Sequence, residues 1–235
     1  IQLDSSGAPV ERVIAELNQA VKLNGLSDVY YRNLASAQLS QVRQHIASYN
    51  GAELTPEQTQ KIADLVSNAI KSGSRATEIE PNYVANWVIR GSIYRDLMSF
   101  AQGAEDLAAQ MFLNAIRIEP TNPVHRTNLG RVYVTVADRA RVLKSAESAE
   151  LAKTAAEQEA GLLQTAEQAF ATAVQLKPDY APAHYYLAAV HERQGKLSDS
   201  VTRLAALRNN NLTDIGLAFQ LSQMLIRLQK FYLAT

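Results

Sequence analysis

Two histidines and several pairs of acidic residues are the side chains of this sequence whose spacing could support chemistry. His184 and His191 lie seven residues apart, about two turns along one helical face, and Glu192 follows the second. A zinc site of the helical kind needs two histidines four residues apart and further ligands nearby. The observed spacing favours packing roles for both histidines. We therefore predict no metal ligands and no bound cofactor.

The acidic pairs are candidates for acid and base catalysis, which needs two carboxylates in different environments of one pocket. The pairs are Glu78 with Glu80, Glu105 with Asp106, and Glu157 with Glu159. We expect all of them on solvated helix faces or at helix ends. The sequence also has no glycine-rich phosphate loop, no nucleophile elbow, and no Ser, His and Asp set in a triad context. We predict no catalytic residues and no enzymatic activity.

A recurring order of large and small residues indicates which elements hold the histidines and acidic residues named above. The order is Trp87, Gly91, Tyr94, Ala108, Phe112, Ala115 and Pro120, and it recurs as Gly130, Tyr133, Ala166, Phe170, Ala173 and Pro178. Two antiparallel helices at close range need a small residue where backbones touch, an aromatic in the neighbouring hole, and a proline that stops the second helix. We therefore expect these aromatic side chains in the core and not in a ligand box.

This order resembles the tetratricopeptide repeat (TPR), whose pattern is W-x2-L-G-x2-Y, then A-x3-F, then P. Residues 87–120 depart from it at Arg90, where the pattern has Leu. The resemblance implies an all-α fold, a right-handed α-solenoid of TPR helix pairs, with enlarged helical hairpins in two of the repeats. It does not identify a ligand, because one scaffold can carry many unrelated functions.

Aligning the pattern along the chain predicts a single TPR array over residues 1–235. Its parts are an orphan helix at 9–24, an enlarged repeat at 28–81, a repeat at 84–120, an enlarged repeat at 123–178, a repeat at 181–212 and a partial repeat at 215–235. The composition of residues 134–165 favours a long helical hairpin that projects from the array, with its turn near Ser145 to Ser148. We expect Leu221 to Ala234 to be a first helix that runs into a second one.

The composition limits the classes of partner. Lys plus Arg and Asp plus Glu number 23 each, so no basic excess indicates a nucleic-acid partner. Cys is absent, which excludes disulfides and thiolate chemistry. No apolar run has the length of a membrane span, so we expect no membrane insertion by these residues. The non-Met start and the apolar last helix lead us to expect a longer parent protein, compatible with an extracytoplasmic or membrane-tethered location.

TPR proteins usually bind partners with the outward-facing residues of successive first helices, and the register transfers this role to a set of positions here. The mixture suits an extended peptide, since Asn and Gln can bond its backbone, Arg can bind a carboxylate, and aromatic rings can cover an apolar side chain. The set is Arg32, Asn33, Ser36, Ser92, Arg95, Thr127, Asn128, Arg131, Tyr185, Tyr186, Phe219, Gln220 and Gln223, together with Val88, Ile89 and Ala189. Solvated groove residues without a ligand are the alternative interpretation.

The leading functional prediction is a non-catalytic scaffold that binds a protein or peptide in a concave TPR groove. Residues 80–94 and 215–234 also resemble TPR tails of bacterial membrane proteins of the O-antigen ligase or polymerase type, which would make the chain part of a surface-polysaccharide assembly protein. One alternative is a glycan-binding or substrate-handling domain of an enzyme. Another is self-association, in which the C-terminal partial repeat stacks on the orphan helix of a neighbour.

Overall fold

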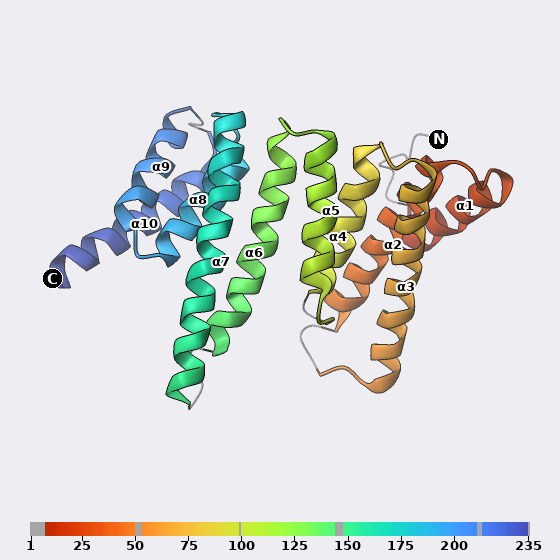
Figure 1. The fold of residues 1–235 in the computed structure, drawn as a ribbon, viewed down its shortest axis with the longest axis horizontal. Coiled ribbons are helices and arrows are strands. Elements are labelled where there is room, and N and C mark those ends of the chain that lie inside the picture. Colours follow the sequence, from red (N-terminus) through yellow and green to blue (C-terminus); the bar gives the residue numbers. More distant parts are fainter. Residues whose placement is uncertain (1–7, 50–52, 99, 144–147, 211–212, 235) are drawn as a thin grey trace. The chain divides into compact units, whose positions relative to one another are not determined.

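The computed structural model describes residues 8–49, 53–98, 100–143, 148–210 and 213–234, and within them it contains ten helices and no strand (Figure 1). The chain divides into two compact units after Glu119. The helices of unit 1 are α1 (Val10–Leu23), α2 (Asp28–Ser48), α3 (Pro56–Ile79), α4 (Val84–Leu97) and α5 (Ala104–Ile118). Those of unit 2 are α6 (Pro123–Leu143), α7 (Ala149–Leu176), α8 (Ala181–Arg193), α9 (Leu197–Asn210) and α10 (Ile215–Ala234). The predicted all-α fold is confirmed.

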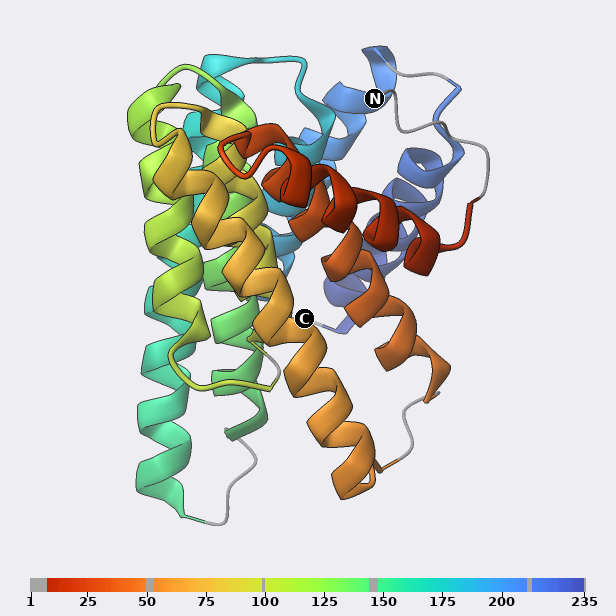
Figure 2. The same ribbon diagram turned by 90° about the vertical axis from the view of Figure 1, so that its right-hand side faces the viewer.

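Unit 1 contains two helix pairs, α2 with α3 and α4 with α5, and α1 packs against α2 (Figure 2). The pair α4/α5 packs through a glycine. A Cβ atom added to Gly91 would lie 2.8 Å from Cε1 of Phe112, whose side chain is fully buried. Only a residue without a side chain fits there, which explains why the small position of the pattern is glycine in this repeat.

Unit 2 repeats this arrangement with the pairs α6/α7 and α8/α9, and α10 packs against α9. A Cβ atom at Gly130 would lie 2.6 Å from Cε1 of Phe170. In the next pair Ala188 takes the glycine position, and the Ser200 hydroxyl donates a 3.0 Å hydrogen bond to the Ala188 carbonyl. The helices can approach closely here because the buried Ser200 hydroxyl has a hydrogen-bond acceptor in the backbone of the facing helix.

The residues expected at packing positions are in the interior with a few exceptions. Ala108, Phe112, Ala115, Ala166, Phe170 and Ala173 are fully buried, and Gly91, Gly130 and Tyr94 are buried. Trp87 and Tyr133 are half-buried, and Tyr133 packs against the buried cluster that contains Phe170. The Trp87 indole N–H reaches the Pro81 carbonyl at 2.6 Å, and this bond keeps one edge of the ring near the surface. Pro120 and Pro178 are exposed just beyond the ends of α5 and α7.

The departure at Arg90 from the repeat pattern is matched by a second departure in the preceding helix. At the position where α5 and α7 carry Phe112 and Phe170, α3 carries Gly73. The Arg90 side chain fills this space, with its Cγ 3.1 Å from where a Gly73 Cβ would be, and its guanidinium donates to the Thr77 hydroxyl at 2.8 Å. The charged side chain therefore has both room and a polar partner in a half-buried site.

The enlarged hairpins are helical as expected. Helix α3 begins with a complete capping box, in which Thr55 Oγ1 accepts from the Gln58 N–H and Gln58 Oε1 accepts from the Thr55 N–H. In unit 2 the α6/α7 hairpin extends beyond α8 and α9 (Figure 1). Its predicted turn falls largely on residues 144–147, outside the described residues, and Ser148 caps α7.

Two ion pairs fix α8 to this hairpin. Arg193 lies 2.8 Å from Glu159 on α7 and 2.9 Å from Asp138 on α6. Glu159 is only 5% exposed, so removing Arg193 would leave an uncompensated carboxylate in the interior. The hairpin is therefore held to the following repeat by charge as well as by apolar packing.

The prediction that Leu221 to Ala234 turns from a first into a second helix is wrong, because α10 continues without a break to Ala234. In the preceding repeat the turn uses Gly195 at φ 78°. The aligned residue in α10 is Gln229, which does not favour a left-handed conformation, and the helix continues. Within the described residues, no helix has both the length and the apolarity of a membrane span.

Candidate binding surface on the first helices

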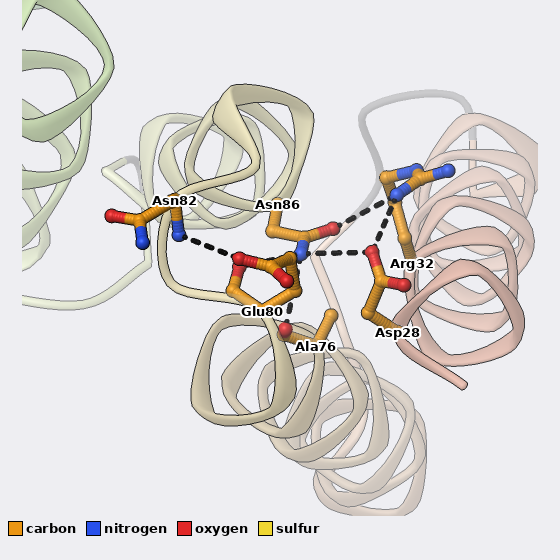
Figure 3. Close-up of polar contacts among 6 residues, drawn as sticks. All are labelled: Asp28, Arg32, Ala76, Glu80, Asn82 and Asn86. Atoms are coloured by element: carbon orange, nitrogen blue, oxygen red, sulfur yellow. Dashed lines mark hydrogen bonds and ion pairs between the residues drawn. The ribbon is translucent and has the colours of Figure 1, made fainter. Parts of the chain in front are cut away.

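In unit 1 a buried asparagine joins three helices at the predicted partner-binding surface (Figure 3). The Asn86 side chain on α4 is fully buried. Its amide nitrogen lies 3.0 Å from the carbonyl oxygens of both Ala76 and Glu80 and 3.1 Å from Asp28 Oδ2. These bonds tie the end of α3 and the start of α2 to α4.

Arg32 completes this network from α2. Its guanidinium donates to Asp28 Oδ2 at 3.0 Å and to Asn86 Oδ1 at 3.1 Å. It also lies over the Tyr83 ring, 4.5 Å from the ring centroid. The side chain is only 17% exposed, so Arg32 is largely committed to interhelical contacts. The structure therefore assigns it mainly a structural role, in contrast to the partner-binding role predicted from the register.

The other predicted positions of unit 1 are partly exposed. Ser36 is exposed, and Asn33, Ser92 and Arg95 are half-buried. Arg95 lies 3.4 Å from Asp96, whose carboxylate also accepts from Arg43 of α2 at 2.6 Å. The surface of α2 and α4 is thus polar, and its charges are already paired.

In unit 2 an arginine lies over a tyrosine ring that stacks on a second aromatic ring. The Arg131 guanidinium on α6 lies 5.4 Å from the centroid of the Tyr186 ring on α8. Tyr186 in turn stacks on Phe170, with centroids 5.3 Å apart and ring planes at 14°. Because Phe170 is fully buried and packs against Gly130, this column of side chains rests on the rigid core of unit 2.

Tyr185, also predicted to contact a partner, holds the start of α10. Its hydroxyl donates to Asp214 Oδ2 at 2.7 Å, and Asp214 Oδ1 accepts from the Leu217 N–H at 2.9 Å. Burial and the bond to the Asp214 carboxylate raise the pKa of Tyr185 to about 12. The Tyr185 bond lowers the pKa of Asp214. Tyr185 is thus half-buried and positions the next first helix.

The remaining positions of unit 2 divide into one buried and several exposed residues. Thr127 is 4% exposed and its hydroxyl donates to the Pro123 carbonyl at 3.0 Å, so its prediction as a surface residue is wrong. That bond within α6 satisfies the hydroxyl and lets the side chain lie inside. Asn128 is half-buried. Phe219, Gln220 and Gln223 are exposed on α10, Phe219 by 63%.

The two histidines lie in hydrogen bonds and not in a ligand cluster. His184 Nε2 lies 2.8 Å from the Pro178 carbonyl, in the same way that the Trp87 indole bonds to Pro81 in unit 1. His191 is 6% exposed, and its Nε2 lies 3.1 Å from Glu167 Oε1. Among the described residues, no group of three His, Cys, Asp or Glu side chains could hold a metal ion.

Glu167 on α7 is the centre of a polar cluster at the C-terminal end of α8. It accepts from Gln194 at 2.9 Å, from Lys196 at 3.1 Å and from the His191 ring. Burial of Glu167 raises its pKa, but the three hydrogen bonds and the Lys196 charge outweigh burial, so the pKa is lowered. A carboxylate held ionised in this way, with no nucleophile among its contacts, supports an ion-pair role in stability and not proton transfer.

Sequence reasoning missed Asn86, Glu167 and Asp214, which organise these contacts. Asn86 precedes the pattern residue Trp87 on a helix whose neighbouring positions are mainly apolar, and a lone amide there could have indicated a buried hydrogen-bonding role. Glu167 and Asp214 act on residues 24 to 29 positions away, so their partners could not be identified without the fold.

Comparison with known proteins agrees with the helix-pair architecture. Residues 157–224 match the family model described as tetratricopeptide repeat. A thermophilic TPR protein of Thermus thermophilus is 17% identical, with a TM-score of 0.61 over 92% of this chain and 91% of its own. A MamA crystal structure is 13% identical, with a TM-score of 0.53 over 93% of this chain and 91% of its own. At these identities the likeness establishes the fold alone.

A structure of a monomeric IFIT1 mutant with the capped oligonucleotide m7Gppp-AAAA is 15% identical, with a TM-score of 0.50 over 84% of this chain and 46% of its own. This match shows that the fold by itself does not determine the ligand class. Among curated proteins, none matches this chain by sequence. The resemblance to O-antigen ligase or polymerase tails finds no support among these matches and stays a prediction.

Proposed function

From the tetratricopeptide-repeat match of residues 157–224 and the helix-pair fold, we propose that this chain is a non-catalytic scaffold that binds a peptide segment of a partner protein on the exposed sides of its first helices. The first helices are α2, α4, α6 and α8, and α10 is the first helix of the last, partial repeat. Each unit binds its peptide on its own first helices.

The observation that carries this proposal is that partly exposed side chains of the first helices are held in fixed orientations. In unit 2, Arg131 rests on Tyr186, and Tyr185 is fixed by Asp214. In unit 1, the exposed ring of Tyr83 is held in place by Arg32, which is itself committed to interhelical contacts. A surface whose polar and aromatic groups are already ordered loses less conformational entropy when a ligand binds. The contact groups are of the kind that dominate binding energy at protein interfaces.

The absence of a catalytic role is also part of the proposal. The titratable groups with shifted pKa values, such as Glu167 and Asp214, are engaged in hydrogen bonds that fix helices. Their pKa shifts therefore have a structural explanation, and a reaction is not needed to account for them.

The test is a pair of equal substitutions on opposite sides of one helix pair. Ala189 on α8 and Ala206 on α9 are both accessible positions, the first on a first helix and the second on a second helix. Peptides selected from a random displayed library against the unmodified chain should bind Ala206→Trp normally, and Ala189→Trp should weaken them by about tenfold or more. The proposal fails if no peptide is enriched, or if only Ala206→Trp blocks binding.

A second candidate function, self-association, is favoured by α10. Ile215, Phe219 and Ile226 lie on one side of this helix and are 84%, 63% and 54% exposed. An apolar row of this kind often marks an interaction site. Sedimentation should then show concentration-dependent dimers or larger species that Phe219→Glu dissociates. A concentration-independent monomer would rule this function out.

A further inference from the structure

Arg131 is held at the surface of unit 2 by stacking and not by an ion pair. Its guanidinium lies over Tyr186, which lies over the buried ring of Phe170. A cation–π contact of this kind uses no N–H hydrogen bond to a carboxylate. Within the described residues the Arg131 guanidinium has no hydrogen-bond or ion-pair partner, so its N–H groups can donate to a ligand.

Several other arginines of the chain have carboxylate partners. Arg32 pairs with Asp28, Arg193 pairs with Asp138 and Glu159, and Arg43 pairs with Asp96. For Arg131, no carboxylate oxygen of the described residues lies within the 4.0 Å that defines an ion pair. A partly buried cation without a counter-charge is a favourable point for an anionic group of a ligand.

The segments of α6 and α8 that hold Arg131 and Tyr186 carry no acidic residue of their own over residues 123–134 and 181–191. The α6 segment includes Arg126 and Arg131, and α8 carries its first acidic residue at Glu192. The Arg131 charge is also close enough to Tyr180 to oppose the rise in the Tyr180 pKa that burial and Tyr186 cause. The Asp214 carboxylate beside α8 is already engaged by the Tyr185 hydroxyl and the Leu217 N–H.

We propose that Arg131, stacked on Tyr186, binds an Asp or Glu side chain, so that the partner segment recognised by unit 2 is acidic. This inference rests on the proposed function, because it names the chemistry of the peptide bound at the same surface. A carboxylate suits the planar fork of the guanidinium, which can donate two parallel hydrogen bonds to it. A peptide backbone placed along α6 and α8 would set such a side chain beside the arginine.

The experiment uses three short synthetic peptides with blocked ends, in which Thr alternates with Glu, Gln or Lys. Their affinities for the complete chain are measured by fluorescence polarisation at low and at high salt. The Glu peptide should bind about tenfold more tightly than the Gln peptide, and the Lys peptide should not bind. Arg131→Gln should abolish the preference for Glu, whereas Arg131→Lys should keep only part of it.

Arg12→Gln on α1 is the matched control, since it removes the same charge from a side chain that is 73% exposed and pairs with Glu16 on its own helix. It should leave the preference for Glu unchanged. An equal affinity for the Glu and Gln peptides overturns the inference, and so does a preference that survives Arg131→Gln or a failure of the Glu peptide to bind. Stronger binding of single-stranded oligothymidine, measured in parallel, would assign the surface to nucleic acid instead.

These results separate the two proposals. If library-selected peptides bind and are blocked by Ala189→Trp while the Glu peptide shows no preference, only the acidic chemistry is wrong. If no selected peptide binds, the proposed function itself fails.

Discussion

Replacing Gly130 by alanine tests the central packing contact of unit 2. The new methyl group would lie 2.6 and 2.7 Å from two carbon atoms of the Phe170 ring, well inside the contact distance of carbon atoms. Phe170 cannot move easily, because it is fully buried and stacked on Tyr186. Overpacking of this kind costs about 1 to 3 kcal/mol, and we expect the upper end here.

Helix propensity acts in the opposite direction, since alanine is favoured over glycine inside a helix by about 1 kcal/mol. The two effects leave a net destabilisation of about 2 kcal/mol for Gly130→Ala. Gly161 on α7 provides the matched control, because it is exposed and no atom lies within 4 Å of its added Cβ. Gly161→Ala should therefore stabilise the chain by about 0.5 to 1 kcal/mol.

The assay is urea unfolding followed by circular dichroism, with the midpoint and slope compared among the three proteins. The same substitution should move the midpoint down at Gly130 and up at Gly161. In the Gly130→Ala background, Phe170→Leu should cost less than it does in the unmodified chain, because the smaller side chain relieves the overlap. A Gly130→Ala variant as stable as the unmodified chain would refute the reasoning from close packing.

Three further predictions concern the polar contacts. Asn86→Ala should lower the free energy of unfolding by about 2 kcal/mol or more, because the Ala76 and Glu80 carbonyls lose their donor. Amide hydrogen exchange should then become faster in α4. The control Asn82→Ala, at an exposed position, should have little effect. Tyr185→Phe should loosen the start of α10 by about 1 kcal/mol. Since the pKa of Tyr185 is raised from 10.0 to about 12, its contribution to stability should be complete below pH 10 and lost as the pH rises toward 12, which phenolate absorbance can follow. Since the pKa of Glu167 is lowered from 4.5, its stabilising effect should be present above pH 4.5 and disappear as the pH falls below this value, and Glu167→Gln should remove this part of the acid sensitivity of unfolding.

The repeat pattern predicted the fold because it is a set of steric requirements. Gly130 and Phe170 are separated along the chain, but each is needed only where two helices meet at close range, so their order in the sequence indicates the pairing. The capping box of Thr55 and Gln58 at the start of α3 is likewise a local pattern of neighbouring residues. Patterns that depend on backbone contact or on neighbouring residues can be recognised without the structure.

Two departures from the pattern that compensate each other at distant positions are harder to recognise from the sequence. Arg90 stands where the pattern has Leu, and its space comes from Gly73 in the preceding helix. The sequence shows both departures but not that they meet. The continuation of α10 past Gln229 was missed because the comparison of whole segments concealed the loss of one glycine.

The candidate site was predicted by register, and register gives the direction of a side chain but not its partners. It placed Arg131 and Tyr186 on neighbouring first helices, and the structure shows them in contact. The register could not show that the Arg32 guanidinium donates to Asp28 and Asn86. Nor could it show that a hydrogen bond within α6 accompanies the burial of Thr127. These outcomes depend on side-chain contacts between helices.

Photo-cross-linking of a library-selected peptide to the chain tests the account most directly. The peptide carries a photoreactive residue at each position in turn, and the sites of attachment are mapped by mass spectrometry. The account predicts attachment to the first helices, for unit 2 on residues 124–135 and 182–192, at positions around Arg131 and Tyr186. Attachment concentrated on α7 and α9 would contradict it, because the peptide would then lie on the second helices.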